Sequence, residues 1–111
     1  MNSKEFEKIL NRRIELTKKV FLKKSAEYSG RGADKLHNFK RAAAALNSTP
    51  EEALIGMKIK HDISILDIVE NIKNGIIPSK ELLEEKCGDS INYLILLEAM
   101  IKERMKKAKQ N

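Results

Sequence analysis

Apolar residues recur every three or four positions along most of this chain, and this spacing restricts its fold more than any other feature. The period matches one face of an α-helix. Strands would need runs of roughly four to eight alternating β-forming residues. The best candidate for such a run, residues 74–79, is too short. The sequence therefore predicts an all-α protein.

Interruptions divide the pattern into four helices, which we expect at about residues 3–28, 33–46, 50–74 and 79–107. Gly30 and Gly32 separate the first two helices, because glycine readily adopts loop conformations. The third helix has the clearest start: Thr49 is the expected N-cap, Pro50 takes the first helical position and Glu52 completes a capping box.

The third helix should end at Asn74 and Gly75, since glycine suits the residue after a helix, and Ser79 should cap the fourth. The apolar positions expected in the core follow the helical period in each segment. In the first three helices they are Phe6, Ile9, Leu10, Val20 and Phe21; Leu36, Phe39, Ala43 and Leu46; and Leu54, Met57, His61, Ile65, Ile68, Val69 and Ile72.

With 111 residues, the chain is predicted to form one domain, residues 1–111. Mostly short connections favour antiparallel neighbours in a four-helix bundle. The fourth helix is apolar nearly all round from Ile91 to Leu97, which is more surface than three short neighbours bury. We therefore expect a homo-oligomer, a dimer or a higher form, with the functional site completed across the interface.

Composition limits the expected cellular location and the expected partners of the protein. No apolar stretch is long enough to span a membrane, and the N-terminus is charged where a signal peptide needs an apolar core. The single cysteine, Cys87, excludes an intramolecular disulfide and a cysteine-based zinc site, so we expect a cytoplasmic protein. The net charge of +6 favours anionic partners, without choosing among nucleotides, nucleic acid and acidic proteins.

Three polar residues on the apolar fourth helix are out of place. Glu85, Asp89 and Asn92 follow each other at steps of four and three, so they project from one side of a helix. Two carboxylates near one point suit Mg²⁺, which prefers oxygen ligands and keeps waters that leave room for phosphates. Glu85 and Asp89 could instead face water near the helix N-terminus, where negative charge is favourable.

Other polar residues allow both functional and structural interpretations. Asp34 and Asn38 are four apart at the start of the second helix, where Asp34 could also serve as a cap. His61 lies on the apolar side of the third helix, where a polar group needs a partner. Lys58 and Lys60 beside it could neutralise phosphates or belong to a solvated surface.

Three segments carry a resemblance to a known family: KSAEYSGRGADKLHNFK, KIKHDISI and EEKCGDSINYLILLE. They resemble the small phage and bacterial nucleotide-modification-associated domains, which are similar to the MazG-like all-α NTP pyrophosphohydrolases. The resemblance covers about residues 24–101. It implies a helical bundle, often oligomeric, that holds Mg²⁺ against a nucleoside triphosphate. Such enzymes cleave between the α- and β-phosphates, giving a monophosphate and pyrophosphate.

Carried onto this chain, the resemblance assigns catalytic, metal and substrate roles. Glu85 and Asp89 become metal ligands and catalytic residues, with Glu27, Asp34 or Asn38 on the opposing side. The substrate-binding residues it implies are Lys24, Asn38, Lys58, Lys60, His61, Asn92 and Tyr93, with Phe39 beside Tyr93 at the base.

The chain also departs from the family pattern. The paired-glutamate motif EExxE is missing from the early helices, and EEKCGD has one residue more than the usual EELGD. Lys86 therefore stands three residues before Asp89, where the metal-binding glutamate is expected, and Glu85 stands four before. Either Glu85 substitutes, or the protein binds nucleotides without hydrolysing them. The alternative from another class is a non-enzymatic basic helical module that binds nucleic acid or a host protein, as a phage accessory protein or inhibitor.

Overall fold

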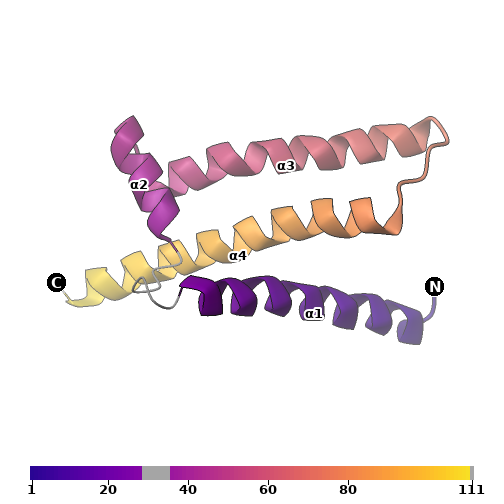
Figure 1. Cartoon of the computed structure of the whole chain (residues 1–111), viewed down its shortest axis with the longest axis horizontal. Coiled ribbons are helices and arrows are strands. Elements are labelled where there is room, and N and C mark those ends of the chain that lie inside the picture. Colours follow the sequence, from indigo (N-terminus) through magenta and orange to yellow (C-terminus); the bar gives the residue numbers. More distant parts are fainter. Residues whose placement is uncertain (29–35, 111) are drawn as a thin grey trace. The chain divides into compact units, whose positions relative to one another are not determined.

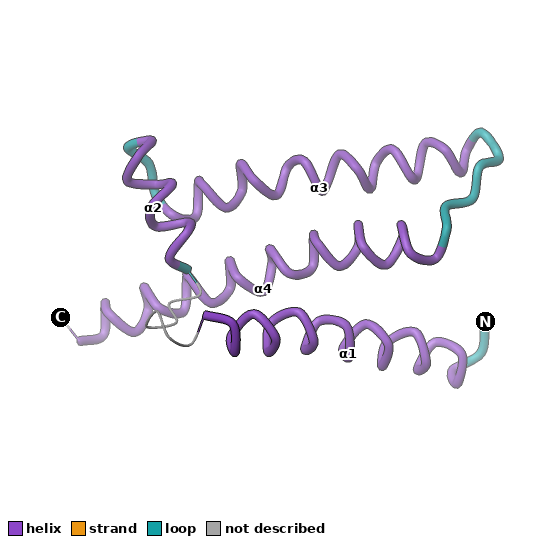
Figure 2. Tube along the Cα trace, viewed as in Figure 1, coloured by secondary structure: helices purple, strands orange, loops and turns teal. Residues whose placement is uncertain are grey.

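The structure, a computed structural model, describes residues 1–28 and 36–110, and the side chains of residues 1–22 and 36–110. This part of the chain is helical and contains no strand, which confirms the all-α prediction (Figure 1; Figure 2). The four helices are α1 (Ser3–Tyr28), α2 (His37–Leu46), α3 (Pro50–Lys73) and α4 (Lys80–Gln110).

The expected helix bounds agree with these closely except at the start of α2. Leu36 lies in a turn before His37, so the helix begins after it. Residues 33–35, which were also expected to be helical, lie outside the described residues.

The chain divides into two compact units, Met1–Lys35 and Leu36–Asn111, and each is described by itself. In the first unit, α1 begins with reciprocal backbone-to-side-chain hydrogen bonds. The Glu5 N–H donates to Asn2 Oδ1 at 2.9 Å, and the Asn2 N–H donates to Glu5 Oε2 at 3.0 Å. Two N–H groups that the first turn of a helix cannot satisfy internally are thereby paired.

In the second unit, α3 and α4 form an antiparallel hairpin (Figure 1). The capping box at the start of α3 is confirmed: the Glu52 N–H donates to Thr49 Oγ1 at 3.2 Å, and the Thr49 N–H donates to Glu52 Oε1 at 3.0 Å. Ser79 caps α4 by accepting a hydrogen bond from the Leu82 N–H at 3.1 Å. Gly75 has a φ of +82°, a conformation that favours glycine, so the chain can leave α3 and turn back.

The core of this unit lies where α2 meets the hairpin. Leu36, Phe39, Leu54 and Met100 form a buried cluster, and Leu54 is completely buried. Tyr93, Leu96 and Leu97 of α4 pack against the cluster. Burial of an aliphatic or aromatic side chain contributes about 1.5–3 kcal/mol, so this cluster is the main stabilising contact between α2 and the hairpin.

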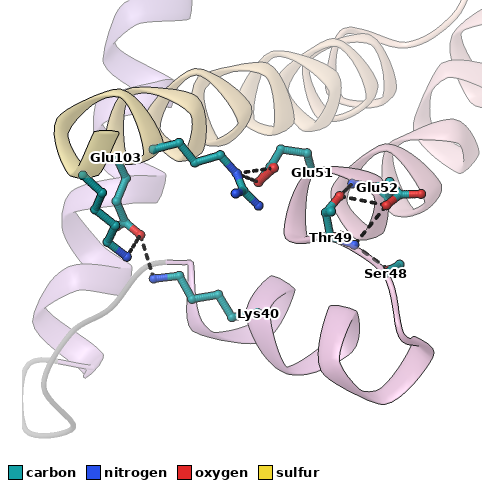
Figure 3. Close-up of polar contacts among 8 residues, drawn as sticks. Lys40, Ser48, Thr49, Glu51, Glu52 and Glu103 are labelled. Carbon is teal, nitrogen blue, oxygen red and sulfur yellow. Dashed lines mark hydrogen bonds and ion pairs between the residues drawn. The ribbon is translucent and has the colours of Figure 1, made fainter. Parts of the chain in front are cut away.

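Two ion pairs reinforce the same end of the unit (Figure 3). Arg104 donates to both carboxylate oxygens of Glu51, at 2.7 and 2.9 Å, and Lys40 lies 3.0 Å from Glu103. Hydrogen bonding to Glu51 raises the pKa of Arg104, and hydrogen bonding from Lys40 lowers the pKa of the Glu103 carboxyl. These contacts connect α4 to the first turn of α3 and to α2.

Several residues expected in the core are exposed instead. They are Phe6, Ile9 and Leu10 of α1, Leu46 of α2, and Met57, Val69 and Ile72 of α3. Leu46 is the last residue of α2. Val69 follows the buried Ile68, and consecutive residues of a helix point about 100° apart. Since α2 and α4 cover only part of the circumference of α3, Val69 is left on an uncovered side.

None of the helices in the described residues is both long enough and apolar enough to cross a membrane.

Candidate functional site

A His–Asp pair joins α3 and α4 near the middle of the hairpin. His61 Nδ1 lies 3.3 Å from Asp89 Oδ2. The imidazole also packs on the ring of Tyr93, with centroids 5.1 Å apart and an interplanar angle of 30°. Phe39 of α2 contacts the Tyr93 ring edge-on, with centroids 6.0 Å apart and an interplanar angle of 74°. Three helices therefore contribute to one connected group of aromatic and polar side chains.

The polar residues of α4 line the same side of the helix. Glu85, Asp89, Asn92 and Tyr93 are separated by steps of four, three and one, and helical residues three or four apart share a side. The Glu85 side chain is mostly exposed, and its Oε1 lies 4.0 Å from Lys86 Nζ. The Asp89 side chain is about one-third exposed, at 35%. The side of α4 that faces His61 therefore presents two carboxylates.

Asn92 presents an unusual group on this side. Its Oδ1 atom is buried, and it accepts no hydrogen bond from any of the described residues. Buried polar atoms are nearly always hydrogen-bonded, and an unsatisfied one costs about 1–3 kcal/mol. The sequence analysis singled out Asn92 because it stands among apolar residues, and the structure leaves its oxygen as an acceptor in need of a partner.

A second polar group lies on the opposite side of the hairpin. Lys58 Nζ donates to both oxygens of Asp62 at 2.8 Å, and the Ser90 hydroxyl donates to Asp62 Oδ1 at 3.1 Å. The hydrogen bond from Lys58 is the main reason that the pKa of Asp62 is lowered, and the one from Ser90 acts in the same direction. Asp62 follows His61, and Ser90 follows Asp89, so this contact and the His–Asp contact flank the line where the helices meet.

This geometry separates the residues that the sequence analysis had grouped. His61, Asp89, Asn92 and Tyr93 come together, with Glu85 one turn away along α4. Lys58 is not among them, because its ammonium is held by Asp62 on the other side of the hairpin.

Two of the remaining predicted residues lie on the surface. The side chains of Lys60 and Asn38 are exposed. The side chains of Lys24 and Glu27 lie outside the described residues, as does Asp34 altogether.

Sequence reasoning missed Asp62 and Ser90. One signal for Asp62 was available, because Lys58 and Asp62 are opposite charges four residues apart on a helix. Nothing in the sequence links Ser90 to Asp62, since the two are 28 positions apart. Their contact depends on how α3 and α4 align.

The donor set can be compared with the needs of a magnesium ion. Within the described side chains, no three His, Cys, Asp or Glu residues gather into a group that could hold a metal. Mg²⁺, however, also accepts amide oxygens and keeps several waters. Glu85, Asp89 and the orphaned oxygen of Asn92 fit that chemistry, since a hard cation would satisfy an acceptor that the described residues leave unpaired.

Comparison with known proteins adds no family or function: no family model, no curated protein and no solved structure matches the chain.

Proposed function

We propose that the protein binds a nucleoside triphosphate together with Mg²⁺ on the Asp89 side of the α3–α4 hairpin and hydrolyses it to a monophosphate and pyrophosphate. The observation that carries the proposal is the buried Oδ1 atom of Asn92, which is paired with none of the described residues and lies about one helical turn from Asp89. An orphaned oxygen acceptor beside a carboxylate suits a cation, and a cation between carboxylates suits a phosphate chain. The net charge of +6 is consistent with an anionic ligand.

In this proposal Asp89, Glu85 and Asn92 hold the metal ion through oxygen atoms. When bound, Mg²⁺ neutralises phosphate charge and lowers the pKa of a coordinated water. Overall, one water molecule is added across the bond between the α- and β-phosphates, and pyrophosphate leaves. His61 orients Asp89 through the Nδ1 contact at 3.3 Å, and a fixed carboxylate loses little entropy when it binds its ligand.

The Tyr93 ring forms one side of the candidate site. Its ring contacts Phe39 edge-on and His61 at a tilt. Aromatic rings in fixed orientations offer contact area at small entropic cost, and nucleobases stack on such surfaces. The partly exposed Tyr93 is therefore the residue we assign to base contact.

The direct test incubates the full chain with a panel of ribo- and deoxynucleoside triphosphates and Mg²⁺, with pyrophosphate as the readout. Thermal melting with the same panel detects binding without turnover, because a ligand that binds only the folded state raises the melting temperature. Turnover supports the full proposal, and a rise in melting temperature alone supports a nucleotide-binding protein without hydrolysis. If no nucleotide is cleaved and none raises the melting temperature, the proposal fails.

A pair of carboxyl-to-amide variants tests the site. Asp89→Asn should remove the Mg²⁺-dependent nucleotide effect, because a neutral amide is a poorer ligand for a hard cation. Asp67→Asn is the matched control, since Asp67 is exposed on α3 and should leave the effect unchanged. Should Asp89→Asn fail to fold, Glu85→Gln provides the test, because the exposed Glu85 side chain contributes little to packing.

The non-enzymatic alternative draws on the basic residues near the end of α4. Three of them are already paired with acidic side chains: Lys102 with Glu98, Arg104 with Glu51 and Lys107 with Glu103. This pairing leaves less charge to meet a phosphate backbone. Binding to duplex DNA that weakens steeply with added salt would favour the alternative over the nucleotide site.

A further inference from the structure

Within the unit Leu36–Asn111, the hairpin carries an apolar face that α2 leaves uncovered, on the side away from the His61–Asp89 pair. Every member is a large aliphatic residue that is between 39% and 65% exposed. We call this set the apolar face; it consists of Ile55, Ile59, Leu66 and Val69 of α3 and Leu83, Leu94 and Ile101 of α4.

Spacing and one hydrogen bond place both halves of the apolar face on the same side. On α3, its members flank Asp62 at steps of three and four, so they share the side of Asp62. On α4, Leu83, Leu94 and Ile101 stand seven before, four after and eleven after Ser90, which keeps them on its side. The Ser90 hydroxyl donates to Asp62 at 3.1 Å, so the two stripes adjoin.

Charged side chains near the centre of the apolar face are mostly paired. On α3 the charged groups, Lys58 and Asp62, satisfy each other through two hydrogen bonds of 2.8 Å. On α4, Lys86 stands four residues before Ser90, and its Nζ lies 4.0 Å from Glu85 Oε1. The centres of protein interfaces are depleted of charged residues, particularly unpaired ones. With Asp62, the α3 stripe follows the alternating three- and four-residue steps of a coiled-coil seam, and the α4 members stand 11 and 7 residues apart, which agrees with the same period. This spacing suits packing against other helices.

We infer that a second copy of this chain packs its hairpin against the apolar face, giving a two-fold symmetric four-helix arrangement. On α3 the face extends about 21 Å, from Ile55 to Val69, and on α4 about 27 Å, from Leu83 to Ile101, at a rise of about 1.5 Å per residue. Two adjacent helices, each about 10 Å wide, present roughly 500 Å² in projection. Side chains project from this plane and add surface, which brings the area toward the roughly 800 Å² that each partner buries in a stable interface.

The size of the core argues for a second copy over an occasional partner. Among the described residues, seven apolar side chains are buried, all of them between α2 and the hairpin or within it. A core this small gives a marginal fold, so the apolar face needs cover whenever the chain is folded. Another copy of the same chain is available wherever the protein is made. Because His61 and Asp89 lie on the other side, each protomer keeps its own candidate site, in contrast to the shared site expected from sequence.

The sole cysteine allows a direct test, because Cys87 lies three residues before Ser90, on the same side of α4 as the apolar face. The full chain, without nucleotide, is examined by analytical ultracentrifugation and, after spin-labelling at Cys87, by electron–electron distance measurement. We expect a dimer with one distance between the Cys87 labels of its two copies. This distance should be shorter than about 36 Å, the length of the 24-residue helix α3. If the unlabelled protein is a dimer and labelling at Cys87 converts it to a monomer, that result would also support the interface. A monomer at the highest concentration reached, as would result if α1 covers the face, overturns the inference.

A matched pair of variants locates the contact. Leu66→Asp places a charge on the apolar face and should weaken dimerisation about tenfold or more. Leu46→Asp changes a similarly exposed leucine at the end of α2, away from the face, and should leave the dimer intact. Equal dimerisation of both variants overturns the proposed interface. If Leu66→Asp does not fold, the wild-type sedimentation and distance measurements decide, and neither depends on nucleotide binding.

Discussion

Replacing Asn92 with leucine should make the protein more stable and remove its response to nucleotide. In the wild type, the Asn92 Oδ1 atom is buried and accepts no hydrogen bond from the described residues. Leucine has a similar size and carries no polar atom that would be left unpaired. Proteins commonly keep a destabilising residue where function requires it, so the two effects should appear together.

The size of the effect follows from the state of that oxygen. A buried acceptor without a partner costs about 1–3 kcal/mol, and leucine is also the better helix former by a few tenths of a kcal/mol. Packing at a half-buried position is less favourable than in a full core, so we expect a net gain of about 1–2 kcal/mol. In a domain of this size that corresponds to a rise in melting temperature on the order of 5 °C.

Thermal and urea unfolding at one fixed protein concentration measure the gain, and melting with nucleotide and Mg²⁺ measures the functional loss. Asn71→Leu is the control, because Asn71 is exposed on α3 and should change stability by less than about 0.5 kcal/mol. A loss of 1 kcal/mol or more in Asn92→Leu would refute the reasoning, since it would mean that the amide is satisfied in solution. A stabilised variant that still responds to nucleotide would refute the assignment of Asn92 as a ligand.

Three further predictions concern the fold. Leu54→Ala should lower the free energy of unfolding by about 3 kcal/mol in urea titrations, because Leu54 is completely buried. Thr49→Ala should cost about 1 kcal/mol by losing the cap of α3, whereas Thr49→Ser should keep most of it; equal melting of the two would contradict this. The folded pKa of Asp62 lies below its ordinary value of 3.8, so its stabilising contribution is complete above that pH and is lost as the pH falls through the lowered value. Asp62→Asn should therefore melt with a shallower pH dependence below about pH 4 than the wild type.

Local chemistry made much of the fold predictable from sequence. Thr49, Pro50 and Glu52 specify the start of α3 through contacts among themselves, and Gly75 supplies the positive φ that ends it. Each of these signals acts within a few residues, so no knowledge of tertiary packing was needed. The helical period likewise places Glu85, Asp89 and Asn92 on one side of α4.

The rest depends on the alignment of one helix against another. His61 meets Asp89, and Asp62 meets Ser90, only because α3 and α4 pack in one particular register. The same register decides that Lys58 is paired away from the candidate site. Exposure of Val69 follows from which side of α3 the other helices cover. A periodic apolar pattern shows that a side can be buried, but not which neighbour buries it.

The neighbouring residues Glu103 and Arg104 act as a joint clasp near the C-terminal end of α4 (Figure 3). One secures Lys40 on α2 and the other secures Glu51 at the first turn of α3. Helix ends unwind more readily than helix middles, so unwinding of the last turns of α4 should break both ion pairs together. Amide protons of α2 and of the opening turn of α3 should then exchange with solvent at rates that track those of the last turns of α4.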